Sequence, residues 1–272
     1  MYKTIFTYLP SAKSAPLLSA VAASLGEKCG ATLVGAHNSV RIMLYGGVPS
    51  DYLAQHNHRQ REEAEAIEAA FGKAANAHGM QHEWRHKALA DNEAFGDIIE
   101  AARTADLIIA GGAGEGDPLG QWYGMPVRLV LETGRPVLLV PENTGIDKLG
   151  EQVTIAWNQS KESARATFDA LPLLQLAARV RVLSVNSTEE STEDPTQELV
   201  ASLKRHGVDA EGVVSNTTDR SESEHLMAEH ARSGSDLLVM GCYGHSRFRE
   251  MVFGGVTQHV LSDLKTTVLM SH

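Results

Sequence analysis

The sequence predicts an α/β protein made of two tandem, doubly wound domains, each with a five-stranded parallel sheet. The first observation is an internal repeat, because Ala105–Gly114 matches Ser235–Gly244 at a constant offset of 130 positions. Short apolar segments also alternate with longer segments of helical pattern in both copies. Several of these segments are continuous apolar runs, such as Leu237–Met240, as expected for strands that helices cover on both faces. Propensity alone does not predict the strand order.

The two copies open on similar strands. Thr4–Leu9 and Val153–Trp157 are short apolar stretches, and each is followed by a polar turn and a helical pattern. Between the copies, Pro141–Gly150 is polar and rich in turn-forming residues, so we predict a linker there. The predicted domains are therefore residues 1–141 and 152–272.

The first copy is longer than the second. The extra residues are expected around Met43–His58, where Gly46, Gly47 and Pro49 interrupt regular structure. A long amphipathic helix over Arg59–His78, rich in Ala and Glu, is predicted after them. Such a helix can dock a partner protein, but we favour the interpretation that it covers the sheet and keeps its charged side in water.

The second copy alternates strand and helix throughout. Strands are predicted at Val153–Trp157, Val180–Val185, around Val208–Val214, Asp236–Gly241 and Thr267–Met270. Helices are predicted at Lys161–Ala178, Pro195–His206, Glu222–Ser233 and Val256–Leu264. Each helix thus lies between two strands, as the crossover connections of a parallel sheet require.

Composition and charge exclude several classes of protein. The 272 residues include 24 basic and 34 acidic side chains, and the net charge of −10 argues against binding to a nucleic-acid backbone. No apolar run is long enough for a membrane span, and the opening residues are too weakly apolar for a secretory signal, so we predict a cytoplasmic protein. The cysteines, Cys29 and Cys242, are too few for a disulfide framework. Neither they nor the 12 histidines show metal-ligand spacing, so no metal is predicted.

A group of glycines follows the fourth strand of the second copy. Gly241 and Gly244 lie at the carboxyl end of this strand, and Gly254 and Gly255 open the next helix. Glycine lets the backbone approach a ligand closely, and ligands of parallel sheets bind at the carboxyl ends of the strands. Free amides at a helix N-terminus favour an anion such as phosphate. Side chains that can add donors or positive charge are Ser246, Arg247, Arg249 and Thr257.

Other phosphate-binding motifs are missing, and structural roles stay open. The sequence has no GxxxxGK[ST] motif and no GxGxxG after the first strand of a copy, so neither a P-loop NTPase nor a Rossmann dehydrogenase is predicted. The glycines can also form simple tight turns, and Trp157 can either stack on a base or pack in the domain. Cys242 is predicted to be a small buried residue rather than a redox group.

These residues resemble the universal stress protein family. The pattern G-x2-G-x9-G follows a strand that begins with Asp236, inside a βα repeat of about 130 residues. Tyr243–Arg247 is especially similar to the family, and Ala156–Ser160 lies where the family usually has V-D-G-S after its first strand. The resemblance covers nearly the whole chain, and it implies two tandem domains of the adenine nucleotide alpha hydrolase-like fold.

The resemblance also implies a ligand and its binding residues. Nucleotide-binding members of the family hold ATP or a related adenine nucleotide between the loop after the first strand and the glycines. By position, Ala156, Trp157 and Asn158 border the adenosine, Val185 borders the base, and the glycines border the ribose and phosphates. The ligand-binding residues predicted in this way, including the neighbours of the glycines, are Ala156, Trp157, Asn158, Val185, Met240, Gly241, Gly244, His245, Ser246, Arg247, Gly254, Gly255, Val256 and Thr257.

Several positions depart from the family pattern. In the second copy, Asn158 replaces the usual Asp and Gly255 stands where Ser or Thr is usual, so part of the expected contacts is lost. In the first copy, Pro10 occupies the Asp position, Met125 replaces the Ser or Thr, and the spacer carries carboxylates that repel a phosphate. We therefore predict that the first domain is degenerate as a nucleotide site and pairs with the second.

The sequence thus predicts a tandem universal stress-type protein that binds a small anionic ligand in its C-terminal domain and acts by binding and signalling. Catalysis is not expected, because no nucleophile–base pair, carboxylate dyad or metal set is visible near the glycines, although slow ATP hydrolysis stays open. The alternative is a structural or interaction protein with vestigial pockets that acts through oligomer or partner contacts. The two domains are expected to form an internal pseudo-dimer, and a homodimer is implied by the resemblance alone.

Overall fold

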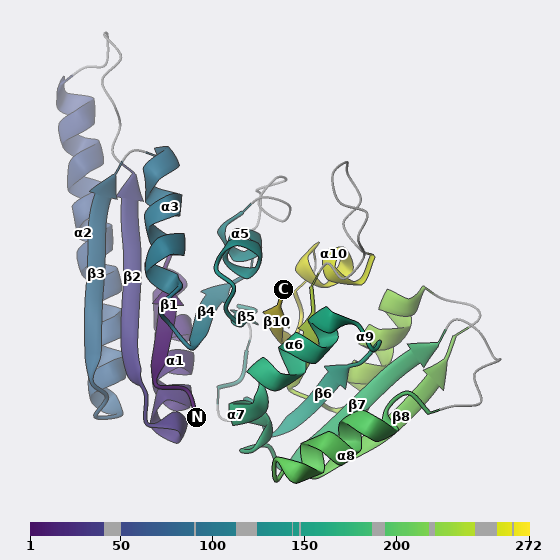
Figure 1. Cartoon of the computed structure of the whole chain (residues 1–272). Coiled ribbons are helices and arrows are strands. Elements are labelled where there is room, and N and C mark those ends of the chain that lie inside the picture. Colours follow the sequence, from purple (N-terminus) through teal and green to yellow (C-terminus); the bar gives the residue numbers. More distant parts are fainter. Residues whose placement is uncertain are drawn as a thin grey trace. The chain divides into compact units, whose positions relative to one another are not determined.

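Strands and helices alternate along the chain in the computed structural model (Figure 1). The structure describes residues 1–40, 50–89, 91–112, 124–142, 144–146, 148–186, 194–217, 221–242, 255–262 and 264–272. It divides into two units, residues 1–111 and 112–272, and each is described by itself. The domain bounds taken from the repeat, 1–141 and 152–272, stay a prediction. Residues 112–141, which the repeat assigns to the first copy, lie in the second unit.

The first unit is a parallel sheet with helices packed on it. Its elements are β1 (Thr4–Tyr8), α1 (Ala15–Cys29), β2 (Thr32–Val40), α2 (Ser50–Ala77), β3 (His82–Leu89), α3 (Asp91–Ala102) and β4 (Leu107–Gly111). The strand order is β3-β2-β1-β4, with parallel pairing throughout. Strand β1 is therefore internal, and its three central residues are buried.

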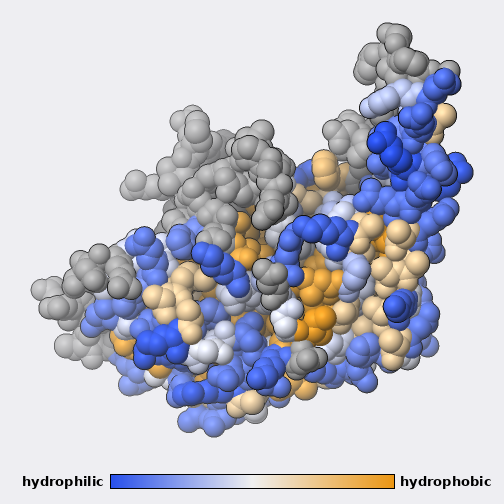
Figure 2. Space-filling model, turned by 180° about the vertical axis from the view of Figure 1, so that it is seen from behind, coloured by the Kyte–Doolittle hydropathy of each residue, from blue (hydrophilic) through white to orange (hydrophobic). Residues whose placement is uncertain are grey.

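Helix α2 packs on β2 through one apolar stripe. Ala64, Ile67, Phe71 and Ala75 are buried and recur at helical spacing. Figure 2, which views the molecule from behind, shows a mainly hydrophilic surface over the outer side of this helix. The amphipathic helix predicted over Arg59–His78 is thus confirmed as a covering helix, although α2 begins earlier than that stretch.

The second unit carries the remaining elements. They are α5 (Met125–Glu132), β5 (Val137–Val140), β6 (Gln152–Ala156), α6 (Lys161–Asp169), α7 (Leu171–Leu174), β7 (Arg179–Asn186), α8 (Gln197–Arg205), β8 (Ala210–Asn216), α9 (Glu222–Ser233), β9 (Leu237–Gly241), α10 (Gly255–Ser262) and β10 (Thr267–Ser271). Within the described ranges of the chain, no helix combines the length and the apolar character that crossing a membrane requires.

The sheet of the second unit has the order β5-β10-β9-β6-β7-β8. Its pairings are parallel from β10 to β8, whereas β5 joins β10 in the antiparallel direction, with Leu138 opposite Leu269. Strand β5 belongs to the first copy by sequence but completes the sheet of the second unit. The chain runs outward from β6 to β8 and then returns to β9 on the other side of β6, so the switch point lies between β6 and β9. The predicted α/β class with a mostly parallel sheet is confirmed.

One predicted helix is wrong in extent. The pattern predicts a single helix over Lys161–Ala178, whereas the structure has two helices there, α6 and the short α7. Pro172 explains the break, because proline has no amide hydrogen to donate to the carbonyl oxygen one turn earlier. The chain turns tightly instead, and the amide of Leu173 donates to the carbonyl oxygen of Ala170 at 2.8 Å.

An aspartate that recurs in the repeat has a structural role. Asp106 lies just before β4, and its Oδ2 accepts hydrogen bonds from the amides of Lys3 at 2.7 Å and Thr4 at 3.0 Å. Asp236 lies just before β9, and its Oδ2 accepts the amide of Gln152 at 2.9 Å. In both copies the carboxylate therefore ties the beginning of the fourth strand to the beginning of the first.

A buried histidine on α9 makes the stability of the second unit depend on pH. His230 is 3% exposed, its Nε2 lies 3.0 Å from Oγ1 of Thr266, and its Nδ1 has no hydrogen-bond partner. Burial lowers the pKa of His230 from 6.5 to about 4. The unfolded chain therefore binds a proton at pH values at which the folded chain keeps this imidazole neutral.

We expect the free energy of unfolding to fall by about 2 to 3 kcal/mol on account of His230 as the pH falls from 6.5 to 4. Above pH 6.5 the imidazole is neutral in both states, so its contribution is fully present. The variant His230→Gln removes the titrating group and should lose this part of the slope. Urea unfolding of both proteins between pH 8 and about pH 4 measures the difference. Parallel stability curves over the whole range would contradict the prediction.

Candidate functional site

The ends of three strands meet at the carboxyl edge of the second sheet. Strand β6 pairs with β7 on one side and with β9 on the other, and Ile155 is level with Val239. This edge lies beside the switch point, where doubly wound sheets bind their ligands. Four of the predicted site residues lie at these strand ends: Ala156, Val185, Met240 and Gly241.

The predicted glycine loop lies mostly outside the described residues. This applies to Gly244, His245, Ser246, Arg247, Arg249 and Gly254. Helix α10 begins at Gly255, close to the predicted position, and Val256 is in its first turn. Thr257 is buried in the same turn, and its hydroxyl hydrogen-bonds the thiol of Cys242, the residue after β9. The beginning of α10 therefore lies beside the carboxyl end of β9.

Cys242 is buried, as predicted. Its amide donates to the carbonyl oxygen of Ser271 at 2.9 Å, which extends the pairing of β9 with β10 by one residue. Burial raises the pKa of the Cys242 thiol, although the hydrogen bond from Thr257 acts in the opposite direction. The reactive thiolate is therefore disfavoured. In the part of the chain that the structure describes, no group of three or more His, Cys, Asp or Glu side chains could hold a metal ion.

Local hydrogen bonds hold the two predicted residues that follow β6. The indole Nε1 of Trp157 donates to the carbonyl oxygen of Pro195 at 2.9 Å, so this half-buried ring is fixed at the edge of the site. Oδ1 of Asn158 accepts the amide of Ser160 at 3.2 Å, in a turn where Gln159 has a φ angle of 59°. Asn158 is exposed, and its side chain therefore shapes the turn that leads into α6.

Gly241 stands where α6 closely approaches β9. A Cβ atom added to this residue would lie 2.4 Å from the carbonyl carbon of Glu162 and 2.5 Å from the amide nitrogen of Ser163. Both of these are backbone atoms, so no side-chain rotation relieves the contact. The packing of α6 against β9 alone therefore requires glycine here, whether or not a ligand also approaches this position.

Glu162 is a feature of the site that sequence patterns did not indicate. This residue of the first turn of α6 is 5% exposed; its Oε1 lies 3.3 Å from Nζ of Lys161, and its Oε2 has no hydrogen-bond partner. The helix N-terminus stabilises a carboxylate at this position. Because the backbone of Glu162 lies against Gly241, the carboxylate adds negative charge near the end of β9. Acidic residues are common in the first turn of a helix. Only the burial of its side chain distinguishes Glu162, and burial depends on tertiary structure.

The first unit has a tyrosine at the position equivalent to Ala156. Tyr8 ends β1 as Ala156 ends β6, and the amide of the following residue, Leu9 or Trp157, donates to the neighbouring strand at 2.9 Å in both cases. Tyr8 is partly buried, and this burial raises the pKa of its phenol to about 12. This strand end thus carries a phenol side chain, whereas the equivalent strand end of the second unit carries only a methyl group. That the first domain is degenerate as a nucleotide site stays a prediction.

Comparisons with known proteins agree with this architecture. Residues 151–272 match the model of the universal stress protein family. A universal stress protein from Archaeoglobus fulgidus DSM 4304 has a similar structure, with 16% identity, coverage of 98% of this chain and 95% of that chain, and a TM-score of 0.72. A putative universal stress protein from Pseudomonas aeruginosa UCBPP-PA14 is 14% identical, covers 99% of this chain and 93% of that chain, and has a TM-score of 0.54. No curated protein matches the chain in sequence.

The fold defines an α/β protein with a mostly parallel sheet, like the solved universal stress protein structure described above. The match to the universal stress protein family covers residues 151–272. The matches to solved structures extend over nearly the full chain, which agrees with a tandem arrangement. The resemblance that the glycine motif predicted is thereby confirmed.

Proposed function

We propose that the second unit binds an adenine nucleotide, or a similar small anionic ligand, at the carboxyl edge of β6, β7 and β9. In this proposal the protein is cytoplasmic and acts in a stress response through binding and signalling rather than turnover. The observation that carries the proposal is the switch point, which brings the ends of β6 and β9 together beside the beginning of α10. The match of residues 151–272 to the universal stress protein family supports it independently.

The chemistry of this edge suits a nucleotide in two respects. Trp157 presents an aromatic surface that its bond to Pro195 holds in place, and a fixed ring is suited to contact a base. The first turn of α10 lies beside β9, so the positive end of the helix dipole is directed toward the same edge and favours phosphate. The Glu162 carboxylate opposes an anion there. Moderate rather than very tight affinity is therefore expected.

A specific set of contacts favours the alternative, a structural or interaction protein with vestigial pockets. Trp157, Asn158, Gly241 and Thr257 each have a structural partner or a packing reason within the second unit. These contacts explain the residues without a ligand. In this alternative the fold acts through contacts with other chains, including a second copy of itself.

Mass spectrometry of small molecules released from denatured, freshly purified protein separates the two functions. Our proposal predicts an adenine nucleotide at near one equivalent per chain, or binding of added ATP, ADP or AMP in calorimetry. A protein that is purified without a ligand and binds none of the three added nucleotides would support the alternative. Sustained phosphate release from ATP by the purified protein would contradict the proposal that it acts without turnover.

Exchanging the residues at the two equivalent strand ends locates the site. We expect Ala156→Tyr to weaken nucleotide binding at least about tenfold, because it gives the second unit the ring that the first unit has at this place. The matched control, Tyr8→Ala, should leave the affinity unchanged. Circular dichroism verifies that both variants are folded. Loss of binding in Tyr8→Ala together with full binding in Ala156→Tyr would place the ligand in the first unit instead.

A further inference from the structure

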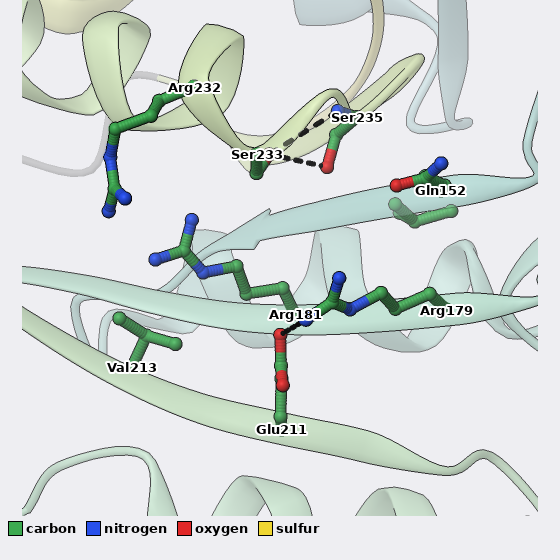
Figure 3. Close-up of a pocket in the computed structure, with 9 residues that line it drawn as sticks. Gln152, Arg179, Arg181, Glu211, Val213, Arg232, Ser233 and Ser235 are labelled. Atoms are coloured by element: carbon green, nitrogen blue, oxygen red, sulfur yellow. Dashed lines mark hydrogen bonds and ion pairs between the residues drawn. The ribbon is translucent and has the colours of Figure 1, made fainter.

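A pocket lies at the edge of the second sheet opposite to the proposed nucleotide site. Figure 3 shows this pocket, which has a volume of about 270 Å³. It opens where β6, β7 and β9 begin, whereas the proposed nucleotide site lies where they end. Six of its lining residues carry the argument: Arg179, Arg181, Glu211, Arg232, Ser233 and Ser235.

The innermost cation of the pocket is poorly neutralised. Arg181 projects from β7 and its side chain is 12% exposed. Its Nη2 lies 3.3 Å from Oε2 of Glu229, and its Nη1 lies 3.5 Å from the carbonyl oxygen of the same residue. Both distances are long for hydrogen bonds between nitrogen and oxygen. A guanidinium has five N–H donors, and the two long contacts with Glu229 use only part of this capacity.

The carboxylate that faces Arg181 is already engaged by another arginine. Arg232, at the end of α9, binds Glu229 with both branches of its guanidinium, at 2.6 Å and 3.2 Å. The hydrogen bond from Arg232 is the largest cause that lowers the pKa of Glu229, and Arg181 contributes less. One carboxylate thus serves two cations, and a largely buried guanidinium lacks a full counter-charge of its own.

Arg179 is the third arginine of the pocket and adds to its positive charge. Arg179 pairs with Glu211 of the neighbouring strand at 2.8 Å, and both side chains are substantially exposed. The close-up shows the guanidinium groups of Arg181 and Arg232 directed toward each other, with Arg179 entering from the other side (Figure 3). Three guanidinium groups thus share the carboxylates of Glu211 and Glu229, in a chain whose net charge is −10.

Hydroxyl groups line the side of the pocket near the beginning of β9. Ser233 and Ser235 have their Oγ atoms 2.8 Å apart, and Oγ of Ser235 lies 2.8 Å from Oγ1 of Thr154. The hydroxyl of Ser233 donates to the carbonyl oxygen of His230 at 2.7 Å, so it offers only lone pairs to the pocket. The hydroxyl of Ser235 can rotate and donate to a bound group. Cations on one side and hydroxyls on another are the groups that bind oxyanions.

We propose that this pocket binds a small oxyanion of the phosphate class, either the free ion or the phosphate of a monoester, with Arg181 as its main anchor. The anion supplies the counter-charge that Arg181 lacks, and the hydroxyl of Ser235 donates to one of its oxygens. The pocket is large enough for such an anion. Its volume of about 270 Å³ accommodates several water molecules, each of which occupies about 30 Å³ in the liquid. The proposal does not depend on nucleotide binding at the other edge.

Calorimetric titration of the full chain with inorganic phosphate, in a chloride buffer of low ionic strength, tests the proposal. We expect saturable binding that Arg181→Met weakens at least about tenfold, because a charge-assisted contact is lost. Glu211→Gln should strengthen binding by about threefold or more, because it frees the guanidinium of Arg179 for the anion. The matched control is Arg85→Met on β3, which removes the same charge from an exposed pair with Glu83 and should leave the affinity unchanged.

A second titration with glycerol 3-phosphate distinguishes the two sources of the anion. Tighter binding of this monoester than of inorganic phosphate supports a phosphorylated metabolite as the ligand, and weaker binding supports the free ion. Binding of neither would overturn the proposal. The proposal would also be overturned if Glu211→Gln left the affinity for phosphate unchanged or lowered it. This second test remains valid even when Arg181→Met fails to fold.

Discussion

Replacing Phe71 by alanine is expected to lower the free energy of unfolding of the first unit by about 3 to 5 kcal/mol. The side chain of Phe71 is fully buried between α2 and the sheet. A Cβ atom at Gly35 would lie 2.7 Å from its ring, and Trp84 has its ring centre 6.0 Å away, so the ring is closely surrounded. Alanine would leave a cavity that β2 and β3 cannot close without losing their pairing. Urea unfolding followed by circular dichroism measures the loss.

The matched control for Phe71→Ala is Glu68→Ala on the exposed side of the same helix. This substitution keeps helix propensity high and removes no buried contact, so we expect a change within about 0.5 kcal/mol. Equal stabilities of the two variants would show that α2 does not contribute to the core of the first unit. That result would also favour the alternative interpretation, in which α2 docks a partner protein.

The sequence was sufficient to predict the α/β class and most elements of the second copy. Continuous apolar runs such as Leu237–Met240 indicate buried parallel strands wherever they occur, because both faces of the sheet are covered. The bounds of α9, Glu222–Ser233, agree with the prediction, since Ser221 and Glu224 form a capping box that is visible in the sequence. Such local signals are independent of tertiary structure.

The pairing of β5 shows what local patterns cannot predict. Val137–Val140 has the continuous apolar pattern of any buried strand, and that pattern does not distinguish the edge of one sheet from that of another. Its antiparallel pairing with β10 depends on contacts between residues more than a hundred positions apart, such as Leu138 and Leu269. The break at Pro172 is different, because the proline was visible and a stricter interpretation of it would have ended the helix earlier.

The candidate site was predictable only in part, for similar reasons. Residues at the strand ends, such as Ala156 and Met240, follow from the repeat together with the rule that ligands bind at carboxyl edges. The burial of Glu162 and the long contacts of Arg181 depend on how helices pack on the sheet. Sequence analysis therefore located the carboxyl edge but not the arginine pocket at the opposite edge, whose side chains come from five separate elements or loops.

Gly241→Ala is expected to destabilise the second unit by about 3 kcal/mol, the other large effect on stability. The added Cβ would meet the backbone of Glu162 and Ser163 at 2.4 and 2.5 Å, so α6 must move away from β9. Relaxation by rotating a side chain is not possible here. The equivalent substitution in the first unit is Gly111→Ala, where the nearest atom to the new Cβ belongs to the side chain of Leu18 at 3.8 Å. That distance is ordinary contact, so the loss there should be small.

Comparing these two variants separates the packing reason for Gly241 from a ligand-binding reason. When packing requires the glycine, Gly241→Ala unfolds at clearly lower urea concentration than Gly111→Ala, and any loss of nucleotide binding accompanies the loss of stability. When only the close approach of a ligand requires it, both variants have wild-type unfolding midpoints, and Gly241→Ala alone loses affinity for ATP. The contact with α6 predicts the first result, because it exists without any ligand at the carboxyl edge.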